Sequence, residues 1–348
     1  MDKFFFKIQK NYKKNILEYD YTSKSKYWEK SVLKKKGLFN LNKLKNFRSN
    51  NLSKNIDDFY INQIEAKKLY NKLISECENN YVKRFLFLKN VGNAKKIFKN
   101  KKEIVTTSDL FHIKYIYEIE KKINLKKINT ICEIGQGFGL LASKLLKIKN
   151  YKFILIDLPE SNYITLFFLK KLFPKKKILM DIDMPNKKLT KNIFRRGDIF
   201  IISPWTKLDN IKVDFFINSR SMMEMNSESI KEYFQLIDKK TNINSYFLCI
   251  NRYYKDLVGY PIEFHKYPFQ NSWKTIVSNS AWMQPHIHFL LVKKTSKKKS
   301  DIKNTLLNIE KKYHQIVKND KIFIRRILPV NIYRYYKLIK YFILTNLK

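Results

Sequence analysis

The stretch NTICEIGQGFGLLASKLL, residues 129–146, places three glycines between an apolar run and a helical pattern. Only seven glycines occur in the 348 residues, so Gly135, Gly137 and Gly139 form a concentrated signal. Glycine permits a tight turn and a close approach of the backbone to a ligand. A helix that begins after such a turn presents N–H groups and a positive dipole end. The stretch therefore predicts a strand, a ligand-binding turn and a helix.

The spacing of the glycines distinguishes between two kinds of ligand. The dinucleotide fingerprint G-x-G-x-x-G would need a glycine at position 140, where the chain has Leu140. The pattern is instead E-x-G-x-G-x-G, and its first residue is Glu133. A carboxylate there would repel a pyrophosphate but suits a ligand with a cationic amino group, such as S-adenosylmethionine. Gln136 lies between the glycines, and we expect its side chain to point outward.

Strand-like and helical patterns alternate through the middle of the chain. Five short apolar runs occupy about residues 130–135, 152–158, 198–204, 213–219 and 246–251. Near-continuous apolar strands suit a parallel sheet that is covered on both faces, and the helical patterns lie between them. We predict an α/β fold with a doubly wound, mostly parallel, Rossmann-like sheet over residues 126–295. The runs at 175–180 and 287–294 are further strand candidates.

Both flanking regions are predicted to be mainly helical. Residues 1–125 form the expected N-terminal extension, with one helix over 56–78 and another that Thr107 or Ser108 would cap. The apolar face of the first helix would comprise Phe59, Tyr60, Ile64, Leu69 and Leu73. Residues 296–348 are predicted to be a basic linker and a helical tail.

The formal charge of +41 has two interpretations. Only nine of the 71 basic residues are arginine, and the lysines are spread along the chain among many Asn, Ile, Phe and Tyr. This mixture is typical of proteins encoded by A/T-rich codons. Sequence-specific nucleic-acid-binding proteins make more use of arginine. We therefore expect no nucleic-acid partner. An RNA-binding protein or RNA methyltransferase remains the alternative, because strong positive charge attracts anionic partners.

The sequence contains no disulfide or metal-binding pattern. Its three cysteines, Cys77, Cys132 and Cys249, are far apart, and the last two lie in apolar runs. No apolar stretch reaches 18 residues and the N-terminus lacks a signal-peptide pattern, so we expect a cytoplasmic protein. The basic, aromatic C-terminal tail is a candidate for peripheral contact with the inner face of the membrane. A packed helix is the alternative for that tail.

A second carboxylate, Asp157, ends the next predicted strand and can accept hydrogen bonds from both hydroxyls of a ribose. Glu133–Gly139 together with Asp157 resembles the class I S-adenosylmethionine-dependent methyltransferases. Five segments narrow the resemblance to sugar O-methyltransferases from bacterial polysaccharide and glycoconjugate clusters, and DLPE and NSRSMMEM are their most specific parts. They are EIGQGFGLLASKLL (133–146), FILIDLPES (153–161), IISPW (201–205), VDFFINSRSMMEMNSESIKEYF (213–234) and YFLCINRYYK (246–255). The resemblance covers about residues 105–295.

The resemblance implies methyl transfer from S-adenosylmethionine to a sugar hydroxyl. The three glycines would then line the methionine part of the cofactor, and Asp157 would hold its ribose. Leu158 would flank the adenine, and Ser203 and Trp205 would border it. Trp205 could equally be a core aromatic residue. A protein that keeps the cofactor fold without catalysis is a further alternative.

We expect the methyl acceptor beside NSRSMMEM, residues 218–225, at the carboxyl end of the fourth strand. Asn218 and Ser219 would reach the cofactor. Arg220, together with Arg252 after the fifth strand, would bind the acceptor. Glu224 would take the hydroxyl proton, or alternatively favour a helix N-terminus through its charge.

His265 is a rival general base, in an aromatic segment suited to packing against a sugar. His286 and His288 share one face of a late strand, but no carboxylate cluster accompanies them, so we predict no metal site. Met222, Met223 and Met225 are interpreted as core-filling residues.

Overall fold

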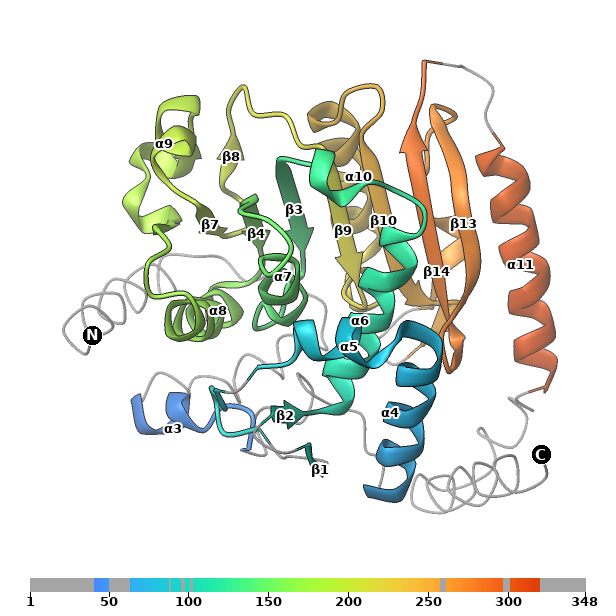
Figure 1. The fold of residues 1–348 in the computed structure, drawn as a ribbon. Helices are drawn as coiled ribbons and strands as arrows, with labels where there is room; N and C mark the ends of the chain where they lie inside the picture. The colour runs from blue at the N-terminus through green and yellow to red at the C-terminus, as the bar shows by residue number, and fades with distance from the viewer. Residues whose placement is uncertain are drawn as a thin grey trace.

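A computed structural model of the protein describes residues 41–49, 63–87, 89–94, 98–100, 103–256, 261–296 and 301–319. An eight-stranded sheet forms its centre, with the order β13-β14-β10-β9-β3-β4-β7-β5 (Figure 1). The strands are β3 (Thr130–Ile134), β4 (Lys152–Ile156), β5 (Ile178–Met180), β7 (Ile199–Ile202), β9 (Phe215–Ser219), β10 (Tyr246–Arg252), β13 (Trp273–Ala281) and β14 (Gln284–Lys294). Six neighbouring strands are parallel, and β14 runs antiparallel to both β10 and β13.

Helices cover both faces of the sheet because successive strand residues point to opposite sides and most are apolar. In β3, for example, Ile131 belongs to one buried cluster while Cys132 and Ile134 belong to the other. The first cluster contains residues of α6 (Thr107–Glu120), α7 (Leu140–Leu145) and α8 (Pro159–Leu172). The second contains residues of α9 (Lys191–Arg196), α10 (Ser227–Lys240) and α11 (Ile302–Asn319). The predicted doubly wound, mostly parallel α/β fold is thus confirmed.

Smaller elements surround this sheet. The N-terminal part contributes α3 (Leu41–Lys45), α4 (Gln63–Cys77) and α5 (Asn79–Phe85), and Figure 1 shows α4 and α5 beside α6. Three two-stranded pairs complete the fold: β1 (Phe98–Asn100) with β2 (Glu103–Val105), β6 (Lys188–Leu189) with β8 (Lys207–Leu208), and β11 (Tyr254–Lys255) with β12 (Ile262–Glu263).

Several sequence-based expectations need correction. Ile64 was assigned to the buried face of the first helix, but its side chain is 70% exposed, whereas Leu69 and Leu73 are buried. The cap of α6 is Thr106, one residue before the predicted candidates. Its hydroxyl accepts the N–H of Asp109, whose carboxylate accepts the N–H of Thr106 in return.

Other expectations fall partly outside the described part of the chain. The candidate strands at 175–180 and 287–294 are present as β5 and β14, whereas β13 was not predicted. Residues 1–40 and the tail from 320 onward lie outside the described residues, as does the linker at 297–300. The division at residues 125 and 295 stays a prediction. Among the residues described, no helix combines the length and apolarity needed to cross a membrane.

The order of the strands places a topological switch point between β3 and β9. From β3 the chain proceeds to β4 and β7 on one side, and later returns to fill β9 and β10 on the other. Ile134, the last residue of β3, lies opposite Ile156 of β4 and Asn218 of β9. Open α/β sheets bind ligands outside the carboxyl ends of the strands at such a point. The glycine turn begins directly after Ile134.

Candidate active site

A cavity of about 850 Å³ opens at the carboxyl ends of β3, β4, β7 and β9. It lies in the upper part of the size range of small-molecule sites. Of the predicted site residues, nine line it: Glu133, Gly135, Gly137, Asp157, Leu158, Trp205, Ser219, Arg220 and Glu224. The structure therefore brings together one set of side chains from four strand ends. Gly139, Ser203, Asn218, Arg252 and His265 are not part of its lining.

The three glycines of the turn have positive φ angles but different surroundings. A Cβ on Gly135 would lie 1.9 Å from Oγ of Ser221, so this glycine permits the close approach of the segment after β9. A Cβ on Gly139 would lie 3.0 Å from Cγ2 of Thr165 on α8. Around Gly137, apart from its two chain neighbours, no atom of the described residues lies within 4 Å of the Cβ position. Gly137 is therefore the glycine that leaves open space for a ligand.

Glu133 is buried between the glycine turn and the first turn of α7. Its carboxylate accepts the backbone N–H of Ala142, while its Oε2 has no hydrogen-bond partner among the residues described. Burial, and after it the nearby charge of Asp157, raise the pKa of Glu133 to about 8. A buried polar atom without a partner is costly unless a ligand satisfies it. The Oε2 atom is thus suited to a cationic hydrogen-bond donor.

Asp157 connects the end of β4 to the glycine turn. Its Oδ2 accepts the N–H of Gly137 at 2.9 Å, and its Oδ1 accepts the N–H of Leu158 at 2.7 Å. Each carboxylate oxygen can accept more than one hydrogen bond, so both retain capacity for a ligand hydroxyl. Asp157 therefore fixes the turn and also faces the cavity.

The segment after β7 contributes Pro204, Trp205 and Thr206 to the lining. Ser203, which was predicted beside them, is buried and donates its N–H and its hydroxyl to Asp181 instead. Trp205 is half-buried and lies on the same cavity as Leu158. Both side chains can therefore contact a ligand in this cavity.

Asn218 has a fully buried amide that holds strand ends together. Its Nδ2 donates to the carbonyl of Ile134 at 2.9 Å and to Oγ of Ser221 at 2.6 Å. Its Oδ1 accepts from the N–H of Met222 and from Nδ2 of Asn251. The structure thus places Ser219 on the cavity and Asn218 behind it.

Charged groups cluster beyond β9. Arg220 lines the cavity with a φ of 65°, a backbone conformation that is uncommon outside glycine and is often found at functional sites. Glu224, in the 3-10 turn Met222–Glu224, pairs with Nζ of Lys255 at 2.5 Å. Burial lowers the pKa of Lys255, and the charges of Arg252 and Arg220 lower it further, against the opposing effect of Glu224. Arg252 therefore stands near this ion pair although it does not line the cavity.

His265 lies in the 3-10 turn Phe264–Lys266, which packs against α11. Its Nε2 is 3.5 Å from Oε1 of Glu310, and its ring centroid is 5.3 Å from that of Tyr313. Met222 is buried in the second cluster, in keeping with core filling, whereas Met223 and Met225 line the cavity. No group of three or more metal-ligating side chains occurs within the described ranges.

Sequence reasoning missed one wall of the cavity, which α6 supplies. Ser108, Phe111, His112 and Tyr115 all line it, at the spacing i, i+3, i+4 and i+7 of one helical face. The available signal was the histidine between two aromatic residues at helical spacing. Gln136 was also misjudged, because its side chain is buried and its Nε2 donates to Oδ1 of Asn162 at 2.7 Å.

Comparisons with known proteins give only distant likenesses. No family model and no curated protein matches the chain. Among solved structures, a mitomycin 7-O-methyltransferase aligns over 54% of this chain and 57% of its own, with 11% identity and a TM-score of 0.38. An O-methyltransferase of a Brevibacillus brevis multienzyme, solved with S-adenosyl-L-homocysteine, aligns over 60% and 91%, with 10% identity and a TM-score of 0.36.

A ribosomal protein L11 methylase from Lactobacillus delbrueckii subsp. bulgaricus aligns over 54% of this chain and 79% of its own. The identity is 14% and the TM-score is 0.34. The chain spans little more than half the length of the mitomycin enzyme. Identities and scores this low do not establish a shared family or activity.

Proposed function

We propose that the protein is an S-adenosylmethionine-dependent O-methyltransferase that acts on a sugar hydroxyl. The acceptor would belong to a polysaccharide, a glycolipid or a sugar-nucleotide precursor. The observation that carries the proposal is an open glycine backbone at Gly137 between two carboxylates, Glu133 and Asp157, at the switch point of the sheet. These two hydrogen-bond acceptors fit a ligand that carries an ammonium group and a ribose, because Oε2 of Glu133 lacks a partner among the residues described.

Within this proposal the cofactor supplies an activated methyl group, and the protein binds and orients it. Glu133 would hold the ammonium group and Asp157 the ribose hydroxyls. Leu158 and Trp205 would enclose the adenine. Holding two reactants in the productive alignment supplies much of the rate in such a transfer.

The remaining part of the cavity supports a sugar as the acceptor. Aromatic side chains line it from two helices, with Phe111 and Tyr115 on α6 and Tyr233 on α10. Their faces can pack against the C–H surface of a sugar ring, and Tyr adds a hydroxyl for hydrogen bonding. Arg220 suits an acidic sugar or the phosphate of a sugar nucleotide.

Calorimetry with S-adenosylmethionine tests the cofactor step. Asp157→Ala should weaken binding by at least tenfold, because it removes the ribose acceptor and releases the N–H of Gly137. Asp214→Ala is the matched control: this carboxylate also accepts two backbone N–H groups, from Asn129 and Thr130, but at the opposite edge of the sheet. Absence of binding by the parent protein would refute the proposal.

Methyl transfer from radiolabelled S-adenosylmethionine tests the acceptor. A panel of methyl glycosides, uridine-diphosphate sugars and lipid-linked saccharides is compared with total RNA at physiological salt. The formal charge of +41 makes RNA the second candidate. Label in a saccharide supports the proposal, whereas label in RNA alone replaces it with the RNA alternative.

A further inference from the structure

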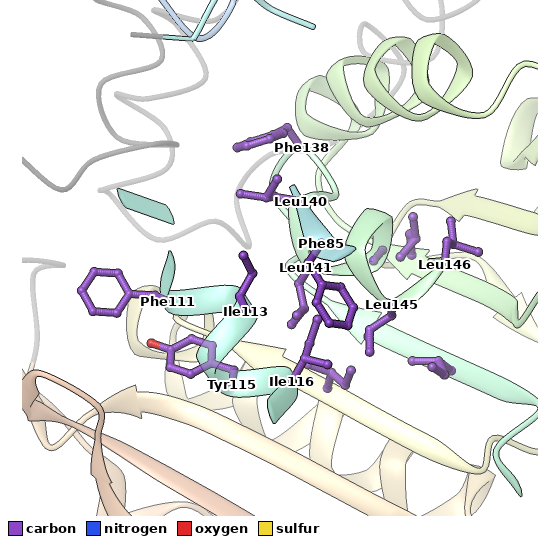
Figure 2. Close-up of a cluster of buried hydrophobic side chains, with 14 of the residues drawn as sticks. Phe85, Phe111, Ile113, Tyr115, Ile116, Phe138, Leu140, Leu141, Leu145 and Leu146 are labelled. Atoms are coloured by element: carbon purple, nitrogen blue, oxygen red, sulfur yellow. The ribbon is translucent and has the colours of Figure 1, made fainter. Parts of the chain in front are cut away.

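The wall of the cavity that α6 supplies lies beside the part of α6 that packs against α7, and Phe111 and Tyr115 of this wall also belong to the buried cluster. Ile113 and Ile116 are fully buried, and Figure 2 shows them pointing toward the α7 side, with Phe111 and Tyr115 on the other side of the helix. Ser108, Phe111, His112 and Tyr115 share the cavity with Glu133 and Gly137. Helix α6 therefore contributes both to the core and to the lining of the cavity.

His112 is the unexplained polar group on this wall. Its Nδ1 is buried, and no hydrogen-bond partner for it exists among the residues described. His288 shows the contrast: its Nδ1 lies 2.9 Å from the hydroxyl of Tyr253 and its Nε2 lies 3.1 Å from Oγ of Ser278. Buried polar atoms in proteins are generally hydrogen-bonded. An imidazole nitrogen left without a partner at a cavity is consistent with a ligand that supplies one.

Burial and the charges around His112 keep its ring neutral. Burial has the largest effect, and the cations Lys144, Arg220 and Arg48 act in the same direction, against the opposing charge of Asp109. Together they lower the pKa of His112 to about 3. The ring is therefore neutral at every physiological pH, and one of its two nitrogens can accept a hydrogen bond.

We propose that His112 is the general base of the methyl transfer and that its face of α6 is the acceptor side of the cavity. This inference rests on the proposed function. As the acceptor oxygen bonds to the methyl carbon, the carbon–sulfur bond breaks and its electron pair stays on sulfur. The hydroxyl proton passes to Nδ1 of His112 and then to solvent. A protonated ether is a far stronger acid than any imidazolium, so a lowered pKa does not prevent this transfer.

The two bases suggested by the sequence are less well placed. Glu224 lines the cavity, but its Oε1 is engaged with Lys255 at 2.5 Å. His265 packs against Tyr313 of α11 and does not line the cavity. Among the described residues that line the cavity, His112 is the only histidine.

A matched pair of substitutions tests the proposal, with the saccharide on which the parent shows transfer as the acceptor. In His112→Asn and His112→Asp an oxygen can occupy the position of Nδ1, but only the aspartate can take up a proton. We expect kcat of His112→Asn to be at least about 100-fold below that of the parent. We expect kcat of His112→Asp to be at least about tenfold above that of His112→Asn. The affinity for S-adenosylmethionine, measured by calorimetry, should stay within about twofold of the parent value in both variants.

Three outcomes overturn the proposal: Asn keeps kcat within tenfold of the parent, Asn and Asp are equally slow, or Asn loses cofactor binding. His314→Asn, an exposed histidine on α11, should keep the parental kcat and KM. The parental kcat should also lack an inflection near pH 6.5, since His112 stays neutral there. If the parent itself neither binds the cofactor nor methylates a saccharide, the proposed function fails whatever happens at position 112.

Discussion

The backbone N–H of Gly137 donates to Oδ2 of Asp157 over 2.9 Å and joins the glycine turn to the end of β4. The same glycine faces open space, whereas Gly135 two residues earlier faces Oγ of Ser221. The two glycines therefore serve different purposes, one for the ligand and one for the fold.

We predict that Gly137→Ala impairs binding more than stability. Its φ of 61° costs alanine about 1–2 kcal/mol in the free energy of unfolding, with no added clash. The new methyl group would point into the cavity and should weaken the binding of S-adenosylmethionine by more than about tenfold. Urea unfolding and calorimetry measure the two effects.

Gly135→Ala is the matched comparison, and it should lower the stability of the fold more than Gly137→Ala does. It carries the same backbone strain, and overpacking against Ser221 should add about 1–3 kcal/mol. Combining it with Ser221→Gly removes the clash and should recover part of the loss. Equal destabilisation by the two glycine variants would contradict this division of purposes.

The ligand-binding edge could be predicted because its residues follow each other closely in sequence. Glu133 and Asp157 end apolar runs, and parallel strands bring their carboxyl ends to one edge. Asn218 also ends such a run, but the space that Gly135 leaves is filled by Ser221, and Asn218 hydrogen-bonds to that serine. Which polar group at a strand end faces the ligand thus depends on packing between strands, which local patterns do not contain.

The wall formed by α6 could not be predicted for a related reason. Its position depends on a contact between distant residues, in which Nζ of Lys144 on α7 lies 2.5 Å from Oδ1 of Asp109 on α6. Strand β13 was missed because its sequence, WKTIVSNSA, is polar and half-exposed at the sheet edge. A local search for apolar runs therefore finds the central strands and overlooks the edge.

We predict that the affinity for S-adenosylmethionine rises with pH between about 6 and 8. Glu133, with a pKa of about 8, carries a proton in the ligand-free protein over this range. An ammonium group requires the carboxylate, so the proton must leave, at a cost of up to about 1.4 kcal/mol per pH unit. Calorimetry in buffers of different ionisation enthalpy measures both the affinity and the proton release.

Glu133→Gln is the control for this pH dependence. Glutamine has the shape of glutamate without its titration, so the variant should bind weakly and with a flat pH profile. An affinity in the parent that stays constant or falls from pH 6 to pH 8 would remove Glu133 from the ammonium-binding role.

Removing one partner of the buried pair of Lys144 and Asp109 should strongly destabilise the fold. Lys144→Met leaves the carboxylate of Asp109 buried without its ion-pair partner and with Arg48 as the remaining cation nearby, which should cost about 3–5 kcal/mol in the free energy of unfolding. Adding Asp109→Asn removes the unpaired charge and should recover part of that loss. Lys188→Met, which breaks an exposed pair with Asp209, should change stability by less than about 1 kcal/mol.

Acid titration provides an independent test of the same pair. Burial by itself would raise the pKa of Asp109, but the charges of Lys144 and Arg48 and the hydrogen bonds from Lys144 and Thr106 lower it below its usual value. Its contribution is therefore present above the unfolded pKa and is lost as the pH falls through the folded one. The parent should lose more stability on acidification below about pH 4 than the double variant. Parallel acid profiles would contradict this assignment.

Glu224→Gln should make stability depend on alkaline pH. Burial already lowers the pKa of Lys255, with Arg252 and Arg220 adding to the effect, and loss of the Glu224 charge would lower it further. A lysine with a depressed folded pKa binds fewer protons in the folded state than in the unfolded state, so stability rises with pH toward 10. Urea unfolding from pH 7 to pH 10 should give a steeper rise for Glu224→Gln than for the parent. The exposed Glu228→Gln should follow the parent at every pH, and an identical slope for Glu224→Gln would show that the pair does not hold Lys255 charged.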